Sequence, residues 1–237
     1  MISLIIPFFN EENELPELIK DFDIFENNNK KIISEYIFIN DCSTDNSLTI
    51  LKELLQSSSN LYNKKIIIFT NSINSGWCKS LNKGYDLATQ KYSLFVPGDG
   101  EARITEFLKD INLQENRDII VYQRKSMIGR PRIRVLISYL YRIILGFGFN
   151  LPKVDFNGII LIKSEIIKKL QLKSNSNFIS AEIILRSKMM GCYIDFNNYF
   201  FLFPKNKYKS TSLSFFQLKK VIFDLLRMYF VFLRLKK

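Results

Sequence analysis

Short apolar runs alternate with helical periodicity along residues 1–100. The runs at 3–6, 36–39, 66–69 and 94–96 are apolar on both faces, which is typical of strands buried in a parallel sheet. Between them, apolar residues recur at helical spacing, as in Leu15, Leu18, Ile19, Phe22 and Phe25. This alternation predicts an α/β fold, a doubly wound and mostly parallel sheet with helices on both faces.

Polar side chains follow three of these strands directly. Asn10 and Glu11 come after the first strand, Asp41 and Asp45 after the second, and Asp99 with Glu101 after the fourth. In doubly wound sheets, ligands bind outside the carboxyl ends of the strands. We therefore expect these three clusters to meet at one edge of the sheet.

The stretch at 92–101, YSLFVPGDGE, joins a buried strand to a turn that carries two carboxylates. Hard cations such as Mg²⁺ take oxygen ligands, often one or two carboxylates together with substrate phosphates. Gly, Pro and Asp are also ordinary turn residues, so a solvated turn is the alternative interpretation. The convergence of three polar clusters on one edge favours the cation site.

The second half of the chain is less regular. Strands are predicted at 119–122, at 159–162 and within 193–203, and helices are predicted through Leu136 to Ile144 and from Ser180 to near Gly191. A basic segment, RKSMIGRPRIR at 124–134, precedes the first of these helices. We expect one domain over residues 1–212.

Residues 213–237 are helical by pattern. On a helical wheel five charged residues share an arc of about 140°; they are Lys219, Lys220, Asp224, Arg227 and Arg234. Such a helix can lie in a membrane interface with its basic residues toward anionic headgroups. The alternative is a helix that packs on its own domain or on a second subunit.

Composition narrows the chemistry. The 237 residues include no histidine, so acid–base chemistry must come from Asp, Glu, Lys, Tyr or Cys. Cys42, Cys78 and Cys192 lack the spacing of a zinc site or a disulfide framework. The net charge of +11 predicts an anionic partner, which is nucleic acid, a phosphorylated ligand or a membrane surface. We expect no signal peptide and no spanning helix, hence a cytoplasmic protein at the periphery of a membrane.

Four motifs occur in order, SLIIPFFNEE, FINDCSTD, NSINSGWCKSLNKGYDLA and LFVPGDGE. Together they resemble the family 2 glycosyltransferases of the GT-A fold, over about residues 1–205. Within that family the chain is most similar to transferases with a polyprenyl-phosphate acceptor, of the dolichol-phosphate mannosyltransferase type. The resemblance implies a nucleotide-sugar donor of the UDP or GDP type and a divalent cation, Mg²⁺ or Mn²⁺.

The resemblance also implies roles for individual residues. Pro7, Phe9 and Glu11 would form the floor of the nucleotide site, and Asp41 would accept a hydrogen bond from the base. The sugar-nucleotide pocket would be shaped by Asn74, Gly76 and Asn82. Asp99 would bind the metal at the diphosphate, and Glu182 matches the acidic residue near the acceptor.

Three positions depart from the family pattern. Pro97 stands where a first metal-binding aspartate is common, so Glu101 is the candidate for a second oxygen ligand. Asn40 replaces the first acidic residue of the D-D-G-S motif, and Cys42 replaces its glycine.

The implied reaction displaces a nucleoside diphosphate from the anomeric carbon with inversion. A lipid-phosphate acceptor is already anionic near neutral pH and needs cations rather than a base. Guanidinium groups suit that task, and the candidates are Arg124, Arg130, Arg132 and Arg134. A hydroxyl of a cell-envelope glycan would instead need a base, for which Glu182 is the candidate. The alternative of another class is an inactive basic module that binds a membrane or nucleic acid, although sheet-edge carboxylates would repel nucleic acid. A homo-oligomer is left open.

Overall fold

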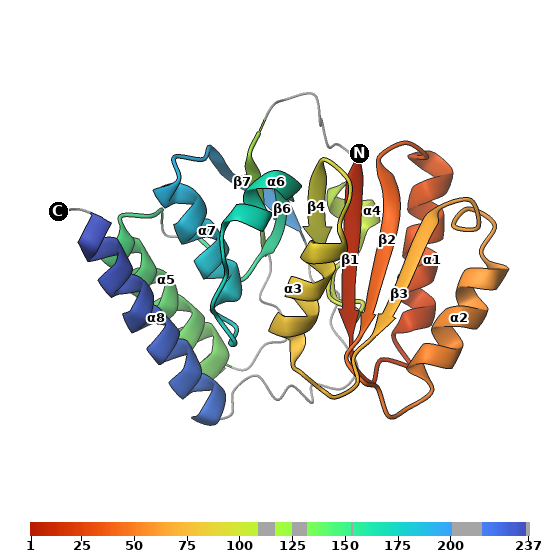
Figure 1. Ribbon diagram of the computed structural model, residues 1–237, viewed down its shortest axis with the longest axis horizontal. Helices are drawn as coiled ribbons and strands as arrows, with labels where there is room; N and C mark the ends of the chain where they lie inside the picture. The colour runs from red at the N-terminus through yellow and green to blue at the C-terminus, as the bar shows by residue number, and fades with distance from the viewer. Residues whose placement is uncertain (109–116, 125–131, 153, 201–214, 236–237) are drawn as a thin grey trace.

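The computed structural model describes residues 1–108, 117–124, 132–152, 154–200 and 215–235. Within these residues, seven strands form one sheet in the order β3-β2-β1-β4-β6-β5-β7 (Figure 1). β6 runs antiparallel to its neighbours β4 and β5, and the other pairings are parallel. The strands are β1 (Ile2–Phe8), β2 (Ile33–Asn40), β3 (Lys65–Thr70), β4 (Tyr92–Phe95), β5 (Ile119–Arg124), β6 (Ile159–Lys163) and β7 (Ile194–Phe200).

Helices cover both faces of this sheet, as the sequence predicted. Leu4 and Ile6 of β1 face one core, which α1, α2 and α4 close. Ile5 of the same strand faces the second core, formed with α3, α5, α6 and α7 and with Met228 of α8. The helices are α1 (Leu15–Asn28), α2 (Ser47–Ser57), α3 (Trp77–Leu87), α4 (Ile104–Phe107), α5 (Arg132–Phe149), α6 (Ser164–Lys169), α7 (Ile179–Met189) and α8 (Phe215–Leu235).

β1 is the centre of the fold, and it continues through Pro7, beyond the apolar run at 3–6 that predicted this strand. All seven of its residues are buried. In a strand the N–H and C=O of one residue face the same neighbour. The Pro7 carbonyl accepts a hydrogen bond from Gly98 N (3.0 Å), on the side where the ladder to β4 has ended at Phe95. Proline therefore removes no donor that the ladder needs.

Helix α3 packs very closely on β1 because Gly84 has no side chain. A Cβ atom at Gly84 would lie 2.2 Å from Ile5 Cγ2 in the core. Gly148, the matched helical glycine in α5, has nothing within 4 Å of its virtual Cβ.

We expect Gly84→Ala to lower the free energy of unfolding by about 1–3 kcal/mol, because the extra methyl overpacks the core. Gly148→Ala is the control. It should leave stability unchanged or raise it by about 0.5–1 kcal/mol, since alanine is the better helix former. Urea unfolding of both variants measures the difference. Equal effects at the two positions would contradict the close α3–β1 contact.

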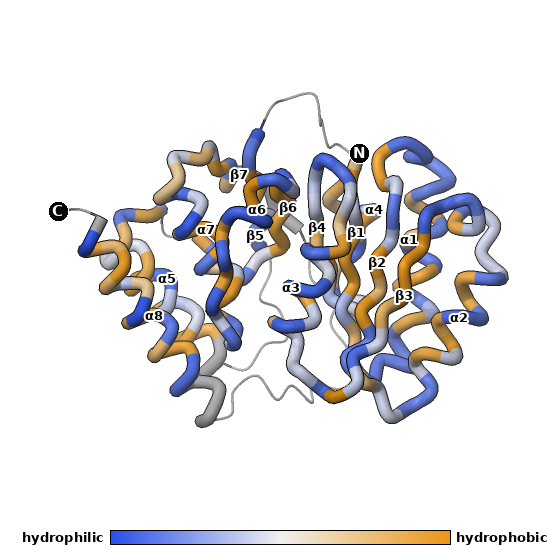
Figure 2. Tube along the Cα trace, viewed as in Figure 1, coloured by the Kyte–Doolittle hydropathy of each residue, from blue (hydrophilic) through white to orange (hydrophobic). Residues whose placement is uncertain are grey.

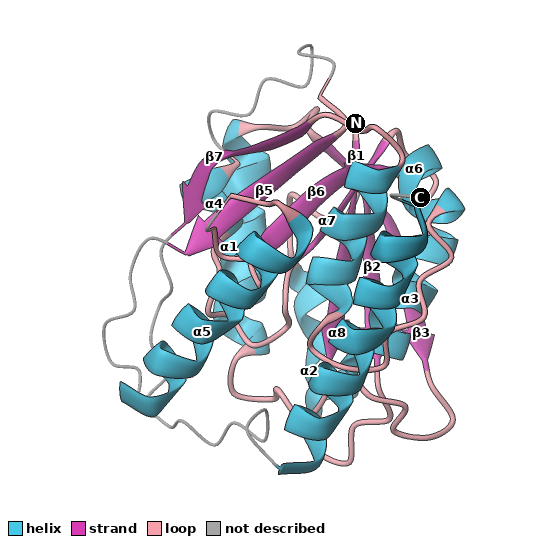
Figure 3. Cartoon of the chain, turned by 90° about the vertical axis from the view of Figure 1, so that its left-hand side faces the viewer, coloured by secondary structure: helices cyan, strands magenta, loops and turns pink. Residues whose placement is uncertain are grey.

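The C-terminal helix predicted at 213–237 is α8, and α5 lies beside it (Figures 1 and 3). Among the described helices, none combines the length and the hydrophobicity needed to cross a bilayer.

Candidate active site

The three polar clusters meet at the carboxyl edge of the sheet, as predicted. Asp41 N donates to Phe8 O (2.9 Å), which holds the start of one loop against the end of β1. On the other side of β1, Gly98 N donates to Pro7 O. A Cβ at Gly98 would lie 2.5 Å from Phe8 Cβ, so only glycine lets the turn approach this closely. The end of β1 therefore positions Asp41 on one side and Asp99 on the other.

The loops after β1 and β2 are joined by side-chain hydrogen bonds. Asn10 N donates to Ser43 Oγ (3.1 Å), and Thr44 N donates back to Asn10 Oδ1 (2.8 Å). Glu11 N donates to Ser47 Oγ (2.8 Å) at the start of α2. These contacts fix the backbone on which Phe9 and Glu11 sit. Phe9 is exposed, whereas Pro7 is buried within β1. Of the three predicted floor residues, Pro7 could therefore shape the nucleotide site only by positioning the end of β1, without direct contact with a ligand.

The structure explains the two departures from the D-D-G-S pattern, Cys42 and Asn40. Cys42 has φ 62°, in the left-handed region where glycine carries no steric penalty. That conformation accounts for a glycine at this place in the family pattern. Asn40 is buried, and its Oδ1 accepts a hydrogen bond from Ser43 N (2.9 Å). An amide thus stabilises this turn where an acid is usual.

Asp41 anchors the loop at 71–76. Its Oδ1 accepts from Asn71 Nδ2 (2.7 Å) and Ser75 N (2.9 Å), and its Oδ2 accepts from Gly76 N (2.8 Å). Only 4% of the residue is exposed. These contacts establish a role in holding the loop. Direct hydrogen bonding between Asp41 and a nucleobase stays a prediction, because loop donors occupy both oxygens here.

The other pocket residues predicted from the motif lie on or just after this loop. Asn74 is exposed, and Gly76 forms the N-cap of α3 with φ 84°. Asn82 is half-buried on α3 itself. The Asp41 contacts therefore place Asn74 and Gly76 beside the end of β2.

Asp99 and Glu101 share the turn after β4. Asp99 Oδ1 accepts from Glu101 N (3.1 Å), and both residues are half-buried. Their oxygens are the hard donors that Mg²⁺ and Mn²⁺ prefer, so these residues fit a divalent cation. No group of three metal-ligating side chains occurs in the described part of the chain. A cation here would take its remaining ligands from water and from the phosphates of a bound donor.

Glu182 lies inside the protein. It has 0% exposure, and it accepts hydrogen bonds from Ser174 N (2.7 Å), Lys173 N (3.1 Å) and Arg186 Nε (2.8 Å). The carboxylate ties the loop before α7 to that helix. In this conformation an acceptor hydroxyl cannot reach it, so its role as a base stays a prediction.

Arg124, one of four predicted acceptor-binding residues, is already paired. It forms a bidentate ion pair with Asp155, including Nη2–Oδ1 at 2.7 Å, and Arg142 lies 3.8 Å from the same carboxylate. Burial alone would raise the pKa of Asp155, but its bonds to Arg124 hold the pKa below the usual range. Arg124 would have to leave Asp155 to bind a phosphate. Arg130 and the side chains of Arg132 and Arg134 lie outside the described residues.

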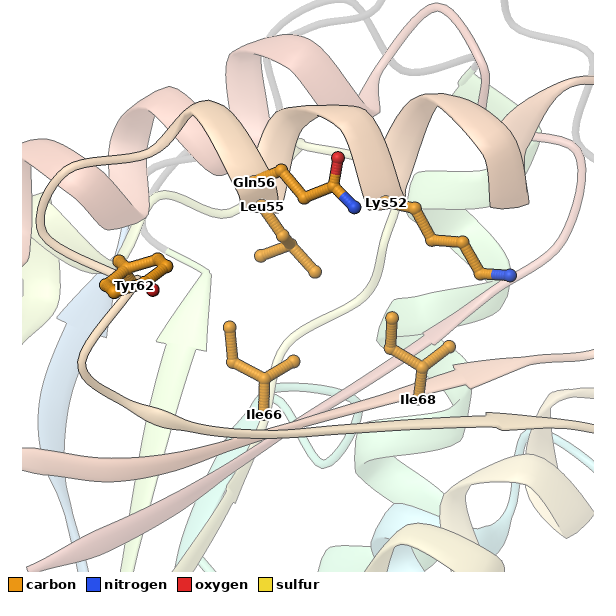
Figure 4. A pocket seen from close by; sticks show the side chains of 6 residues that line it. All are labelled: Lys52, Leu55, Gln56, Tyr62, Ile66 and Ile68. Carbon is orange, nitrogen blue, oxygen red and sulfur yellow. The ribbon is translucent and has the colours of Figure 1, made fainter.

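A shallow hollow of about 310 Å³ lies away from this edge, between α2 and the outer strand β3 (Figure 4). Its lining contains one lysine and no carboxylate; the residues are Lys52, Leu55, Gln56, Tyr62, Ile66 and Ile68. It has none of the groups that the proposed chemistry needs, so the sheet edge is the better candidate.

The model of the family described as glycosyl transferase family 2 matches residues 3–170, which is 168 of the 237 residues. The chain belongs to glycosyl transferase family 2. The matched range of this family 2 glycosyltransferase contains all four motifs and the sheet-edge clusters. Glu182, α7 and α8 lie beyond it.

Solved structures share the fold of the family 2 chain. Glucosyl-3-phosphoglycerate synthase from Mycobacterium tuberculosis, solved with UDP, has a TM-score of 0.69 at 13% identity, covering 97% of this chain and 80% of that one. A mannosyltransferase from Pyrobaculum calidifontis, solved with GDP-Man and Mn²⁺, has a TM-score of 0.58 at 15% identity, covering 87% and 58%. S. aureus TarS has a TM-score of 0.58 at 20% identity, covering 98% and 64%.

The chain thus spans less than two thirds of the length of the last two proteins. A search of curated proteins returns no match. At these identities the likeness establishes the GT-A fold.

Proposed function

We propose that this family 2 glycosyltransferase moves a sugar from a UDP- or GDP-type nucleotide sugar to an acceptor, with inversion. One observation carries the proposal. The turn with Asp99 packs against the end of β1, beside the joined loops that contain Glu11 and Asp41. A donor lying across this edge would meet backbone and side chains of three loops at once. Two similar folds, the mannosyltransferase and the synthase, were solved with GDP-Man and with UDP, which supports this donor class.

In the proposed reaction an acceptor oxygen forms a bond to the anomeric carbon while the bond from that carbon to the diphosphate oxygen breaks. The nucleoside diphosphate leaves with the electron pair. When bound, a divalent cation would supply positive charge for this leaving group. Asp99 would hold that cation, with Glu101 as the second candidate ligand. The anchored loop at 71–76 would orient the donor sugar.

For the acceptor we favour a polyprenyl phosphate. A phosphate monoester is already anionic near pH 7, since its second pKa is about 6, and it needs no base to attack. That suits a site whose predicted base, Glu182, has its oxygens engaged by Ser174 N, Lys173 N and Arg186. A glycan hydroxyl is the alternative acceptor, and it would require Glu182 to become accessible.

A donor screen tests the proposal. UDP- and GDP-sugars are incubated with the protein and Mn²⁺ or Mg²⁺, with polyprenyl phosphate, with a cell-envelope glycan or with neither, and release of nucleoside diphosphate is measured. We expect release from one donor, loss of release with a chelator, and stimulation by the lipid phosphate. Stimulation by a glycan alone would transfer the acceptor assignment to a hydroxyl. Failure to bind any nucleotide in the presence of metal would refute the proposed function.

A further inference from the structure

Helix α8 docks on the domain through a side that combines apolar residues such as Met228 with a buried acid. Asp224 is 4% exposed, and its Oδ2 accepts hydrogen bonds from Ser174 Oγ (2.6 Å) and Ser176 Oγ (2.7 Å). Arg227 pairs with Asp224 (3.0 Å) and lies 3.8 Å from Glu182. The charged arc predicted from the sequence was expected to face headgroups. The part of the arc with Asp224 and Arg227 instead faces the protein, where Ser174, Ser176 and Glu182 lie beside them.

The opposite side of α8 is apolar and points away from the protein. Phe223 is 68% exposed and Phe230 is 63% exposed. Helix α5 extends this surface, since Phe149 of α5 packs on Phe232 of α8 with ring centroids 5.3 Å apart. We call the combined surface the α5/α8 face; its exposed apolar residues are Val135, Leu136, Tyr139, Leu140, Ile144, Phe147, Ile222, Phe223, Leu226, Tyr229, Phe230 and Leu233. Figure 2 shows apolar residues along both helices.

An ordinary surface helix turns its apolar stripe inward and its charges to water, whereas α8 has apolar residues on both sides and buries an acidic one. Soluble monomers rarely expose contiguous apolar patches of more than a few hundred Å². The large apolar side chains that α5 and α8 turn outward therefore call for an apolar partner on the α5/α8 face.

We propose that the α5/α8 face docks onto the surface of an anionic lipid bilayer. The charges of the two helices favour an anionic membrane over a second copy of the chain. Residues 132–149 and 215–235 contain seven basic residues, of which Arg142 and Arg227 lie beside acidic residues of the protein, and a single acidic one, the buried Asp224. Lys219 and Arg234 are exposed on the same side of α8 as Phe223 and Phe230, and long basic side chains can extend to the headgroups while their apolar neighbours insert. A second copy of the chain would instead bring basic residues against basic residues with no acid between them.

The position of the α5/α8 face suits the proposed reaction with a lipid phosphate, and this part of the argument rests on that proposed function. Both helices begin at the end of the molecule toward which β1, β2 and β3 point (Figures 1 and 3). The carboxyl edge of the sheet, with Asp99, lies at that same end. A phosphate headgroup in the bilayer would then approach the donor site without its lipid chain leaving the membrane.

Vesicle sedimentation of the full chain tests the docking. We expect binding to vesicles of phosphatidylcholine mixed with phosphatidylglycerol, and weaker binding to phosphatidylcholine alone or in high salt. The double variant Phe147→Glu/Phe223→Glu should lower partitioning by on the order of tenfold or more. The control is Tyr62→Glu. Tyr62 is 76% exposed, as is Phe147, but it lies beside α2, so this variant should bind like the unaltered protein.

Light scattering and nucleotide binding complete the design. A dimer in lipid-free buffer that Phe147→Glu converts to a monomer, without vesicle binding, would assign the face to a second copy and overturn the proposal. A monomer that ignores vesicles would overturn it as well. Binding of UDP or GDP with Mn²⁺ should be the same in all variants. Nucleotide binding without vesicle binding therefore refutes only the docking, and vesicle binding without nucleotide binding refutes only the proposed function.

Discussion

Replacing Asp99 by asparagine should lower turnover of the nucleotide sugar by on the order of a thousandfold. Without this carboxylate the cation is held less well, and the negative charge that develops on the leaving diphosphate is then less stabilised. The fold should not suffer. An asparagine Oδ1 can still accept the hydrogen bond from Glu101 N that closes the turn. Steady-state kinetics with Mn²⁺, together with thermal unfolding, measure the two effects separately.

Two further variants isolate the metal role of Asp99. Glu101→Gln removes the second candidate ligand and should have the smaller effect, with weaker apparent affinity for Mn²⁺. Asp86→Asn changes an exposed carboxylate on α3 and should leave turnover unchanged. Full activity of Asp99→Asn would remove this residue from the metal site.

The first half of the fold was accessible from sequence because its signals are local. A strand buried on both faces is a continuous apolar run, and the residues that follow it lie at the sheet edge by topology. The same reasoning ended β1 too early at Pro7. Proline lacks a backbone N–H, but at position 7 the pairing with β4 has already ended, so no hydrogen bond is lost. The length of the neighbouring strand β4 cannot be read from the sequence around Pro7.

Long-range partners were not accessible in this way. A helical wheel groups Asp224 with Arg227, but it does not say which side of α8 faces the protein. Ser174 and Ser176 decide the orientation, and they lie about fifty residues away in the sequence. The hydrogen bonds between Asp41 and the loop at 71–76 are likewise long-range contacts that the sequence does not reveal. Short α4 and α6 escaped notice because they contain too few turns to show a period.

Replacing Glu182 by glutamine separates two roles for this residue. We expect the free energy of unfolding to fall by about 3–5 kcal/mol, because a buried carboxylate that satisfies Arg186 and two backbone N–H groups loses its charge. With a polyprenyl-phosphate acceptor, kcat of the folded protein should stay within a few-fold of the original value. Denaturant unfolding and kinetics below the transition temperature report the two quantities.

The matched control is Glu165→Gln, an exposed carboxylate at the start of α6, which should change neither quantity. The double variant Glu182→Gln/Arg186→Gln should lose less stability than the sum of the single variants, since each removes the same ion pair. If Glu182 were also the base for a hydroxyl acceptor, kcat of the folded variant would fall by about 10²–10⁴-fold in addition to the loss of stability. That result would require the loop before α7 to open during turnover, and it would replace the lipid phosphate by a glycan hydroxyl as the acceptor.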